Sequence, residues 1–170
     1  MNPIERIIEA AKDNKLTILK NLSTNNPDID TFREMINDLK ESGEFKYLCG
    51  VQKGHLKTGL DRLCDGDHII NELSKTEDLK PTGPYILLSE DYGTGLLNHA
   101  DQWTVLHINF GGTCEWSFYD DPQAHPYMSI YLEPGDGLWM PYHMYHSTKS
   151  LDVPRYGMAI TFHSLGQGVL

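Results

Sequence analysis

Hydrophobic and polar positions alternate with a period of two along much of the chain from residue 84 onward. Successive side chains of a strand point to opposite faces, so this period, with many aromatic and β-branched residues, is typical of β-strands. Six segments carry the pattern most clearly: residues 84–90, 104–110, 114–119, 128–132, 138–140 and 155–163. With the segments around His99 and His146 they give about eight short strands, which is enough to curl a sheet into a small barrel.

Turn residues lie between these segments. Gly111-Gly112-Thr113 predicts a tight hairpin, and Asp120-Asp121-Pro122 predicts a loop. The run 133–137 (EPGDG) predicts a turn that needs both a fixed φ and a positive φ.

The last predicted strand, residues 155–163, has two unlike faces. One face is large and apolar, and is made of Tyr156, Met158, Ile160 and Phe162. The other face begins with a single arginine, Arg155, and continues with the small residues Gly157, Ala159 and Thr161 and with His163. We expect the large face to pack against a partner layer and the small face to leave a cavity. A guanidinium at the end of a pocket suits a carboxylate, because its planar fork can pair with both oxygens.

Before residue 84 the pattern is mixed and partly helical. Residues 3–13 are predicted to form a helix, because Asn2 can cap it and its isoleucines share one face. Thr31 and Glu34 form a capping-box pattern that predicts a second helix, which Gly43 ends.

Shorter segments connect these helices to the barrel. Residues 16–22 suit a strand that extends the sheet, with a helix as the alternative. Residues 54–66 are punctuated by glycine and predict a loop or a broken helix that could cover an active site. Asp67 is expected to cap a short helix, and residues 80–84 (KPTGP) break the chain before the first barrel strand.

The size of the chain fits one domain over residues 1–170. Its 170 residues are 39% hydrophobic, which allows a sizeable core without disulfides. We expect residues 1–83 to supply supporting helices and added strands, and residues 84–163 to form the barrel core. The sequence gives no indication of oligomeric state.

Charge and cysteine usage narrow the class of protein. A net charge of −10 opposes contact with phosphate backbones, so nucleic acid is not an expected partner. Cys49, Cys64 and Cys114 show no CxxC spacing, so neither a disulfide framework nor a zinc site is expected. No apolar run approaches membrane-spanning length and no leader pattern is present, so we expect a cytoplasmic protein with no membrane partner.

The candidate chemistry lies in the barrel. His99 and Asp101 are two residues apart, so in an extended segment both side chains point the same way and could grip one ion. Two imidazoles and one carboxylate with open positions opposite suit Fe(II), and His146 could be the third ligand. His143 is a competitor, because it lies near the same strand. Arg155 follows His146 by nine residues.

At this point the motifs show a resemblance. HADQWTVLHINFGGTCEW and LEPGDGLWMPYHMYHS resemble segments of the Fe(II)- and 2-oxoglutarate-dependent oxygenases, particularly the Jumonji-type and cupin-like hydroxylases. The resemblance covers roughly residues 84–163. It implies a mainly β fold with flanking helices, namely a double-stranded β-helix or jelly-roll, cupin-like barrel. It also implies iron bound by His99, Asp101 and His146, since His146 and not His143 falls at the family's distal position.

One position departs from the Jumonji-type pattern. Those members usually carry Lys or Arg in the hairpin after the first two ligands, where this chain has Cys114. A distal histidine followed about nine residues later by Arg is similar to the prolyl-hydroxylase-like branch. The resemblance therefore implies that Arg155 binds the far carboxylate of 2-oxoglutarate, and Tyr85 and His107 are candidates for further hydrogen bonds to that cosubstrate.

The activity implied by the resemblance is oxygenation. With Fe(II) and O2, 2-oxoglutarate is decarboxylated to succinate and a C–H bond of a substrate is hydroxylated. A protein side chain is the favoured substrate and a prolyl residue is compatible with the Arg155 pattern, while a small molecule stays open. The alternatives are a metal-binding cupin of another class, such as an isomerase or a cosubstrate-independent dioxygenase, and a non-catalytic cupin-like binding module.

Overall fold

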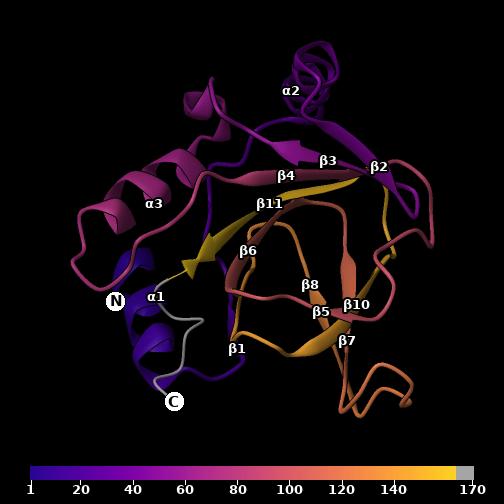
Figure 1. Ribbon diagram of the computed structural model, residues 1–170. Coiled ribbons are helices and arrows are strands. Elements are labelled where there is room, and N and C mark those ends of the chain that lie inside the picture. The colour runs from indigo at the N-terminus through magenta and orange to yellow at the C-terminus, as the bar shows by residue number, and fades with distance from the viewer. Residues whose placement is uncertain (164–170) are drawn as a thin grey trace.

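Two antiparallel sheets face each other and form the body of the protein (Figure 1). The structure is a computed structural model that describes residues 1–163. Eight strands of the second half supply the barrel: β4 (Tyr85–Ser89), β5 (His99–Ala100), β6 (Thr104–Gly111), β7 (Cys114–Tyr119), β8 (Met128–Leu132), β9 (Gly137–Met140), β10 (Tyr145–Ser150) and β11 (Arg155–Phe162). Four lie in the larger sheet in the order β9-β6-β11-β4, and four form the smaller sheet in the order β5-β10-β7-β8. The predicted double-stranded β-helix is confirmed.

Three further strands widen the larger sheet. β1 (Thr17–Leu19) pairs with β9 at one edge, which confirms the strand predicted within residues 16–22. At the other edge β3 (Val51–His55) pairs with β4, and β2 (Phe45–Leu48) pairs with β3. The sequence did not predict this β2–β3 hairpin.

The connection from β6 to β7 differs from its prediction. Gly111-Gly112-Thr113 was predicted to close a tight hairpin, and this is wrong, because β6 and β7 lie in different sheets. The turn instead carries the chain from the larger to the smaller sheet. Gly112 has φ 66°, and a Cβ there would lie 2.8 Å from Arg155 Cα, so the crossing is close to the start of β11. The positive φ predicted in the run 133–137 is confirmed at Gly135, where φ is 90°.

The first helix is as predicted. α1 (Pro3–Asp13) begins at Asn2, whose side chain accepts a hydrogen bond from the Glu5 backbone N–H at 2.9 Å, and the Glu5 carboxylate accepts one from the Asn2 N–H. This reciprocal pair satisfies two backbone donors at the helix start.

The second helix begins earlier than predicted. α2 (Ile29–Ser42) has Asp28 as its N-cap, with the Asp28 carboxylate accepting from the Thr31 N–H at 2.8 Å. The capping box predicted at Thr31 and Glu34 is therefore wrong. Asp28 is an equally good cap, and starting there adds a turn that carries Ile29 onto the core. Gly43 ends the helix as predicted, with φ 78°.

Residues 54–66 are not a loop over the cavity. Gly54 and His55 belong to β3, and the chain then forms the 3₁₀ helix η1 (Leu60–Leu63), which leads into α3 (Asp65–Ser74). Leu56 and Leu63 are buried in the core on the helix side, so only the first two residues of this segment reach the cavity. α3 begins two residues before Asp67, so the predicted cap is also wrong.

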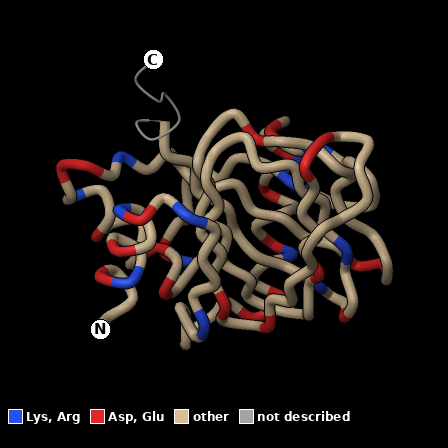
Figure 2. The backbone as a smooth tube through the Cα atoms, turned by 90° about the horizontal axis from the view of Figure 1, so that it is seen from below, with Lys and Arg blue, Asp and Glu red and all other residues tan. Residues whose placement is uncertain are grey.

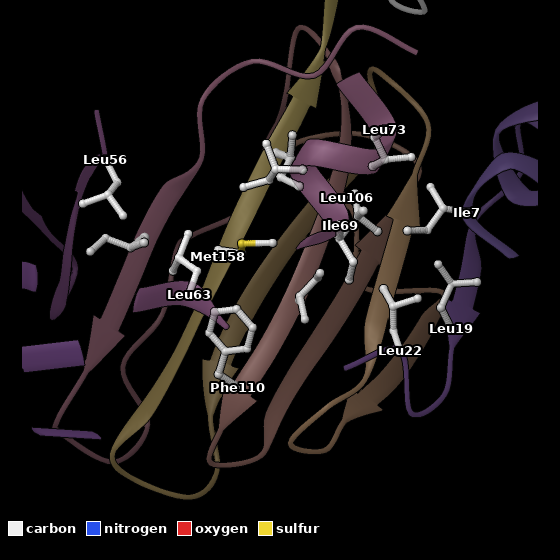
Figure 3. Packing of buried hydrophobic residues seen from close by; sticks show 14 of the residues in the cluster. Ile7, Leu19, Leu22, Leu56, Leu63, Ile69, Leu73, Leu106, Phe110 and Met158 are labelled. Carbon is white, nitrogen blue, oxygen red and sulfur yellow. The ribbon is translucent and has the colours of Figure 1, made fainter. Parts of the chain in front are cut away.

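The main core lies between the helices and the larger sheet (Figure 3). Ile7 of α1 and Ile69 and Leu73 of α3 point toward the sheet, where Leu106 and Met158 meet them. Fully burying one such side chain stabilises the fold by about 1.5 to 3 kcal/mol. The partner layer predicted for the large face of β11 is therefore the helical layer. Within residues 1–163 no helix combines the length and the apolar character that crossing a bilayer requires.

Candidate active site

A cavity of about 350 Å³ lies between the two sheets. The larger sheet contributes His107, Arg155 and Ala159, and the smaller sheet contributes Trp116 and His146. The small face of β11 therefore borders a cavity, as its side-chain sizes predicted. Its volume lies at the lower end of the range usual for ligand sites.

Three of the predicted site residues meet on one wall of this cavity. β5 and β10 pair with His99 directly opposite His146, and Asp101 follows β5 immediately. The distance from His99 Nε2 to Asp101 Oδ1 is 3.8 Å, and that from His146 Nε2 to Asp101 Oδ2 is 3.6 Å. The candidate ligand atoms all lie within 4.8 Å of one another. We call this set the His99–Asp101–His146 cluster.

Backbone carbonyls fix the orientation of both imidazoles. His99 Nδ1 donates to the Leu97 carbonyl at 2.7 Å, and His146 Nδ1 donates to the Met144 carbonyl at 2.9 Å. A carbonyl only accepts, so each Nδ1 carries a proton, and in a neutral imidazole Nε2 then keeps the lone pair that can bind a metal. Such outer hydrogen bonds are typical of metal-ligating histidines.

Burial and exposure in the cluster also suit an ion. His146 is 2% exposed, and this burial lowers the pKa of its imidazole and favours the neutral form that can bind a cation. His99 and Asp101 are each 37% exposed, so the cluster is open on one side. Three ligands on one side of an ion leave positions for other molecules on the opposite side.

Arg155 is a buried cation without an acidic partner. Its side chain is 1% exposed, no ion pair links it to a carboxylate within residues 1–163, and its Nε has no hydrogen-bond partner there. Its one side-chain hydrogen bond among these residues joins Arg155 Nη2 to His107 Nε2 at 3.4 Å. Because an unpaired buried charge is costly, this arrangement suits an anionic ligand in the cavity.

His107 is a neutral neighbour of that cation. Burial is the main reason why the pKa of His107 lies well below its usual value, and the charge of Arg155 is the second reason. A guanidinium has only donors, so His107 Nε2 must accept and the imidazole proton lies on Nδ1.

The remaining residues considered from the sequence fall in different places. Tyr85 lines the cavity at its rim, where it is 42% exposed and packs on His55 with ring centroids 5.0 Å apart. His143 is exposed, and only its backbone reaches the cluster, donating from N–H to the Asp101 carbonyl at 3.0 Å. Cys114 is fully buried in the smaller core cluster and does not line the cavity.

Sequence reasoning missed part of the cavity wall. The β2–β3 hairpin contributes Lys46, Lys53 and His55, and its strands were not predicted. Trp103 also lines the cavity, stacked on His163 with ring centroids 3.9 Å apart.

No protein-family model matches the sequence, and no curated protein matches it. Solved structures do match. A structure of YcfD, a ribosomal oxygenase from Escherichia coli, in complex with cobalt and 2-oxoglutarate has a TM-score of 0.68 and 19% identity. That match covers 88% of this chain and 48% of the YcfD chain. A second Escherichia coli YcfD structure gives a TM-score of 0.69 and 16% identity, covering 94% of this chain and 52% of the other.

This chain has the fold of YcfD. The agreement extends over most of this chain and shows a shared fold at low sequence identity. The chain spans about half the length of YcfD, so the similarity concerns one part of that protein. A third YcfD structure, in complex with cobalt and succinic acid, matches with a TM-score of 0.68 and 19% identity over the same share of each chain.

Proposed function

We propose that the protein is an Fe(II)- and 2-oxoglutarate-dependent oxygenase that hydroxylates a C–H bond of a protein side chain. The observation that carries this proposal is that the His99–Asp101–His146 cluster and the unpaired Arg155 line the same cavity. A metal site and a carboxylate site in one pocket are what an oxygenase that consumes a 2-oxo acid requires.

The cluster fits the metal by its donor set. Two imidazoles and one carboxylate, with an open side, are the ligands typical of Fe(II) oxygenases. When bound, iron would supply the activation of O2 that hydroxylation needs. The chain itself orients the ligands through the carbonyls of Leu97 and Met144.

Arg155 fits the cosubstrate by its charge and its vacant hydrogen-bonding capacity. Its guanidinium would pair with the far carboxylate of 2-oxoglutarate and place the keto acid end toward the cluster. His107 holds the guanidinium from one side, and its Nδ1–H is a candidate donor to the ligand. Tyr85 is a candidate donor from the rim.

A protein substrate is supported by the description of YcfD as a ribosomal oxygenase. A prolyl side chain is compatible with the Arg155 position, and a small-molecule substrate is the alternative. A cupin of another class would use the cluster but would leave the buried charge of Arg155 without a role. A non-catalytic binding module would leave the open side of the cluster without a role.

The test is a comparison of binding and turnover. Under anaerobic conditions, addition of Fe(II) and 2-oxoglutarate should produce a visible metal-to-ligand charge-transfer band, which reports the keto acid bound to the metal. Admission of air should then release succinate, and mass spectrometry of a treated lysate should find a peptide that has gained one oxygen. Metal binding with no charge-transfer band and no succinate would reject the proposal in favour of another class of cupin.

A further inference from the structure

Two lysines face each other at the rim of the cavity. β2 and β3 pair with Lys46 directly opposite Lys53, and both side chains line the cavity. Cross-strand partners have Cβ atoms about 4.5 to 5.5 Å apart, and like charges in this position are destabilising. The pair is therefore not explained by the stability of the hairpin.

Neither lysine forms an ion pair with a carboxylate among residues 1–163. The lysines and arginines that form ion pairs within residues 1–163 are Lys20, Arg33, Lys57, Arg62 and Lys75. Glu44 lies at the same rim and already accepts a hydrogen bond from Lys57. The Lys57 hydrogen bond is the main cause that holds the pKa of Glu44 below its usual value, and the charge of Lys46 contributes least. Glu44 therefore lies near Lys46, but its ion pair is with Lys57.

The lysine pair is separate from Arg155. Lys53 is in register with Leu87 of β4, and Leu87 is in register with Gly157 of β11. Lys53 thus lies two strands away from β11, roughly 10 Å at the usual strand spacing. The lysines therefore extend from strands at the outer edge of the sheet, and Arg155 extends from a strand in its interior.

The pair lies at an open edge of a chain that is acidic as a whole. β2 is the edge strand of the larger sheet, and its Tyr47 and Leu48 are exposed. The chain carries a net charge of −10, with acidic and basic positions interspersed over the helices and outer loops (Figure 2). An unpaired basic rim on such a molecule would attract a negative group to the mouth of the cavity.

We propose that Lys46 and Lys53 bind an anionic group of the peptide substrate, a carboxylate or a phosphate, close to the residue that enters the cavity. The inference rests on the proposed function, and it specifies the substrate as an acidic segment of a protein. Arg155 then serves the cosubstrate and the lysine pair serves the substrate.

Binding of labelled peptides tests the rim. The probes are three fluorescein-labelled peptides of equal length in which glycine alternates with glutamate, phosphoserine or lysine, measured by fluorescence anisotropy on the protein loaded anaerobically with Fe(II) and 2-oxoglutarate. One or both of the anionic peptides should bind and the lysine peptide should not, and comparison of the two anionic probes separates carboxylate from phosphate. Raising the salt from about 0.05 to about 0.5 M should weaken binding, because exposed charges are screened.

Matched variants locate the effect. The double variant Lys46→Gln, Lys53→Gln should weaken binding of the anionic peptide on the order of tenfold. The control Lys12→Gln, Lys75→Gln removes the same charge from exposed helix positions and should change binding little. Equal weakening in both variants would show a general charge effect and overturn the inference, as would absence of anionic peptide binding or preference for the lysine peptide.

The readouts separate this inference from the proposed function. The charge-transfer titration with 2-oxoglutarate should give the same midpoint in the Lys46, Lys53 double variant as in the parent. If the parent shows no charge-transfer band, the proposed function fails. If the band is present and the double variant binds the anionic peptides as the parent does, only the role of the rim fails.

Discussion

Replacing Arg155 by methionine should abolish 2-oxoglutarate binding at ordinary concentrations without unfolding the protein. Arg155 is 1% exposed, and among residues 1–163 its Nε has no partner and its Nη2 meets only the neutral His107, so no carboxylate compensates its charge there. Methionine fills a similar volume and removes that charge. We therefore expect the ligand-free variant to be at least as stable as the parent, because apolar replacement of a poorly compensated buried charge is commonly neutral or stabilising.

The loss of ligand affinity can be estimated. Truncating one member of a buried, hydrogen-bonded charge pair costs about 2 to 5 kcal/mol. Since about 1.4 kcal/mol corresponds to tenfold, the dissociation constant of 2-oxoglutarate should rise roughly 30-fold to a few thousand-fold. Metal binding should persist, because the His99–Asp101–His146 cluster is unchanged.

Thermal unfolding gives a measurement independent of turnover. With metal present and 2-oxoglutarate at about 100 times the parent dissociation constant, the ligand should stabilise the parent by about 2.7 kcal/mol. A variant that binds about 100-fold more weakly should gain only about 0.4 kcal/mol. For a chain of this size these values correspond to a rise in Tm of roughly 5 to 11 °C in the parent and about 1 to 2 °C in the variant.

The control is Arg62→Met, which removes a guanidinium that pairs with Asp38 and does not line the cavity. It should keep the full ligand-induced rise in Tm. If Arg155→Met keeps the same rise as the parent, the carboxylate role of Arg155 is wrong and a cupin that needs no 2-oxo acid becomes the better proposal. A ligand-free Arg155→Met protein that is several kcal/mol less stable would instead show that the charge is compensated in the folded chain.

Three further outcomes are expected. His146→Ala should abolish Fe(II) binding measured by metal titration while His143→Ala leaves it nearly unchanged, and the reverse result would contradict the ligand assignment. Cys114→Ala should leave the 2-oxoglutarate midpoint within a few-fold and lower stability to denaturant by about 1 kcal/mol, because the thiol is packed in the smaller core and not in the cavity. Folded His107 has a lowered pKa, so the unfolded chain takes up its proton first as pH falls below about 6.5, and the parent loses up to about 1.4 kcal/mol per pH unit from this residue. His107→Gln should lose stability less steeply between about pH 7 and pH 5 in urea unfolding, and parallel curves would contradict the neutral imidazole.

Several barrel strands could be predicted because buried and less buried positions alternate along them, as in β7, β10 and β11. β11 shows this most clearly, since Met158, Ile160 and Phe162 are buried against the helices and the residues between them face the cavity. The same alternation placed His99 and Asp101 on one side of the chain. That His99 would lie opposite His146 depends on the register of β5 with β10, which local pattern alone does not determine.

The features missed from the sequence depend on distant parts of the chain. β2 has no alternating pattern, because Lys46, Tyr47 and Leu48 are all exposed and the strand forms only through its pairing with β3. The turn at Gly112 has a positive φ, but the choice between a hairpin and a crossing is made by the neighbours of β6 and β7. The earlier start of α2 reflects two capping residues of similar strength, Asp28 and Thr31.

The long sequence separation of the paired strands has a consequence for how the chain folds. β1 finds its partner only when Thr17 meets Trp139, and β4 is closed on its far side only when Ser89 meets Arg155. Pairings of this kind require large loops to close first, so we expect folding in milliseconds to seconds and not in microseconds. During synthesis, α1 and α2 can form early, but the sheet they cover is incomplete until β11 has left the ribosome. His146 lies in β10 and Arg155 in β11, so the cavity is complete only when both of these strands have joined their sheets, and the His99–Asp101–His146 cluster cannot form before β10 pairs with β5.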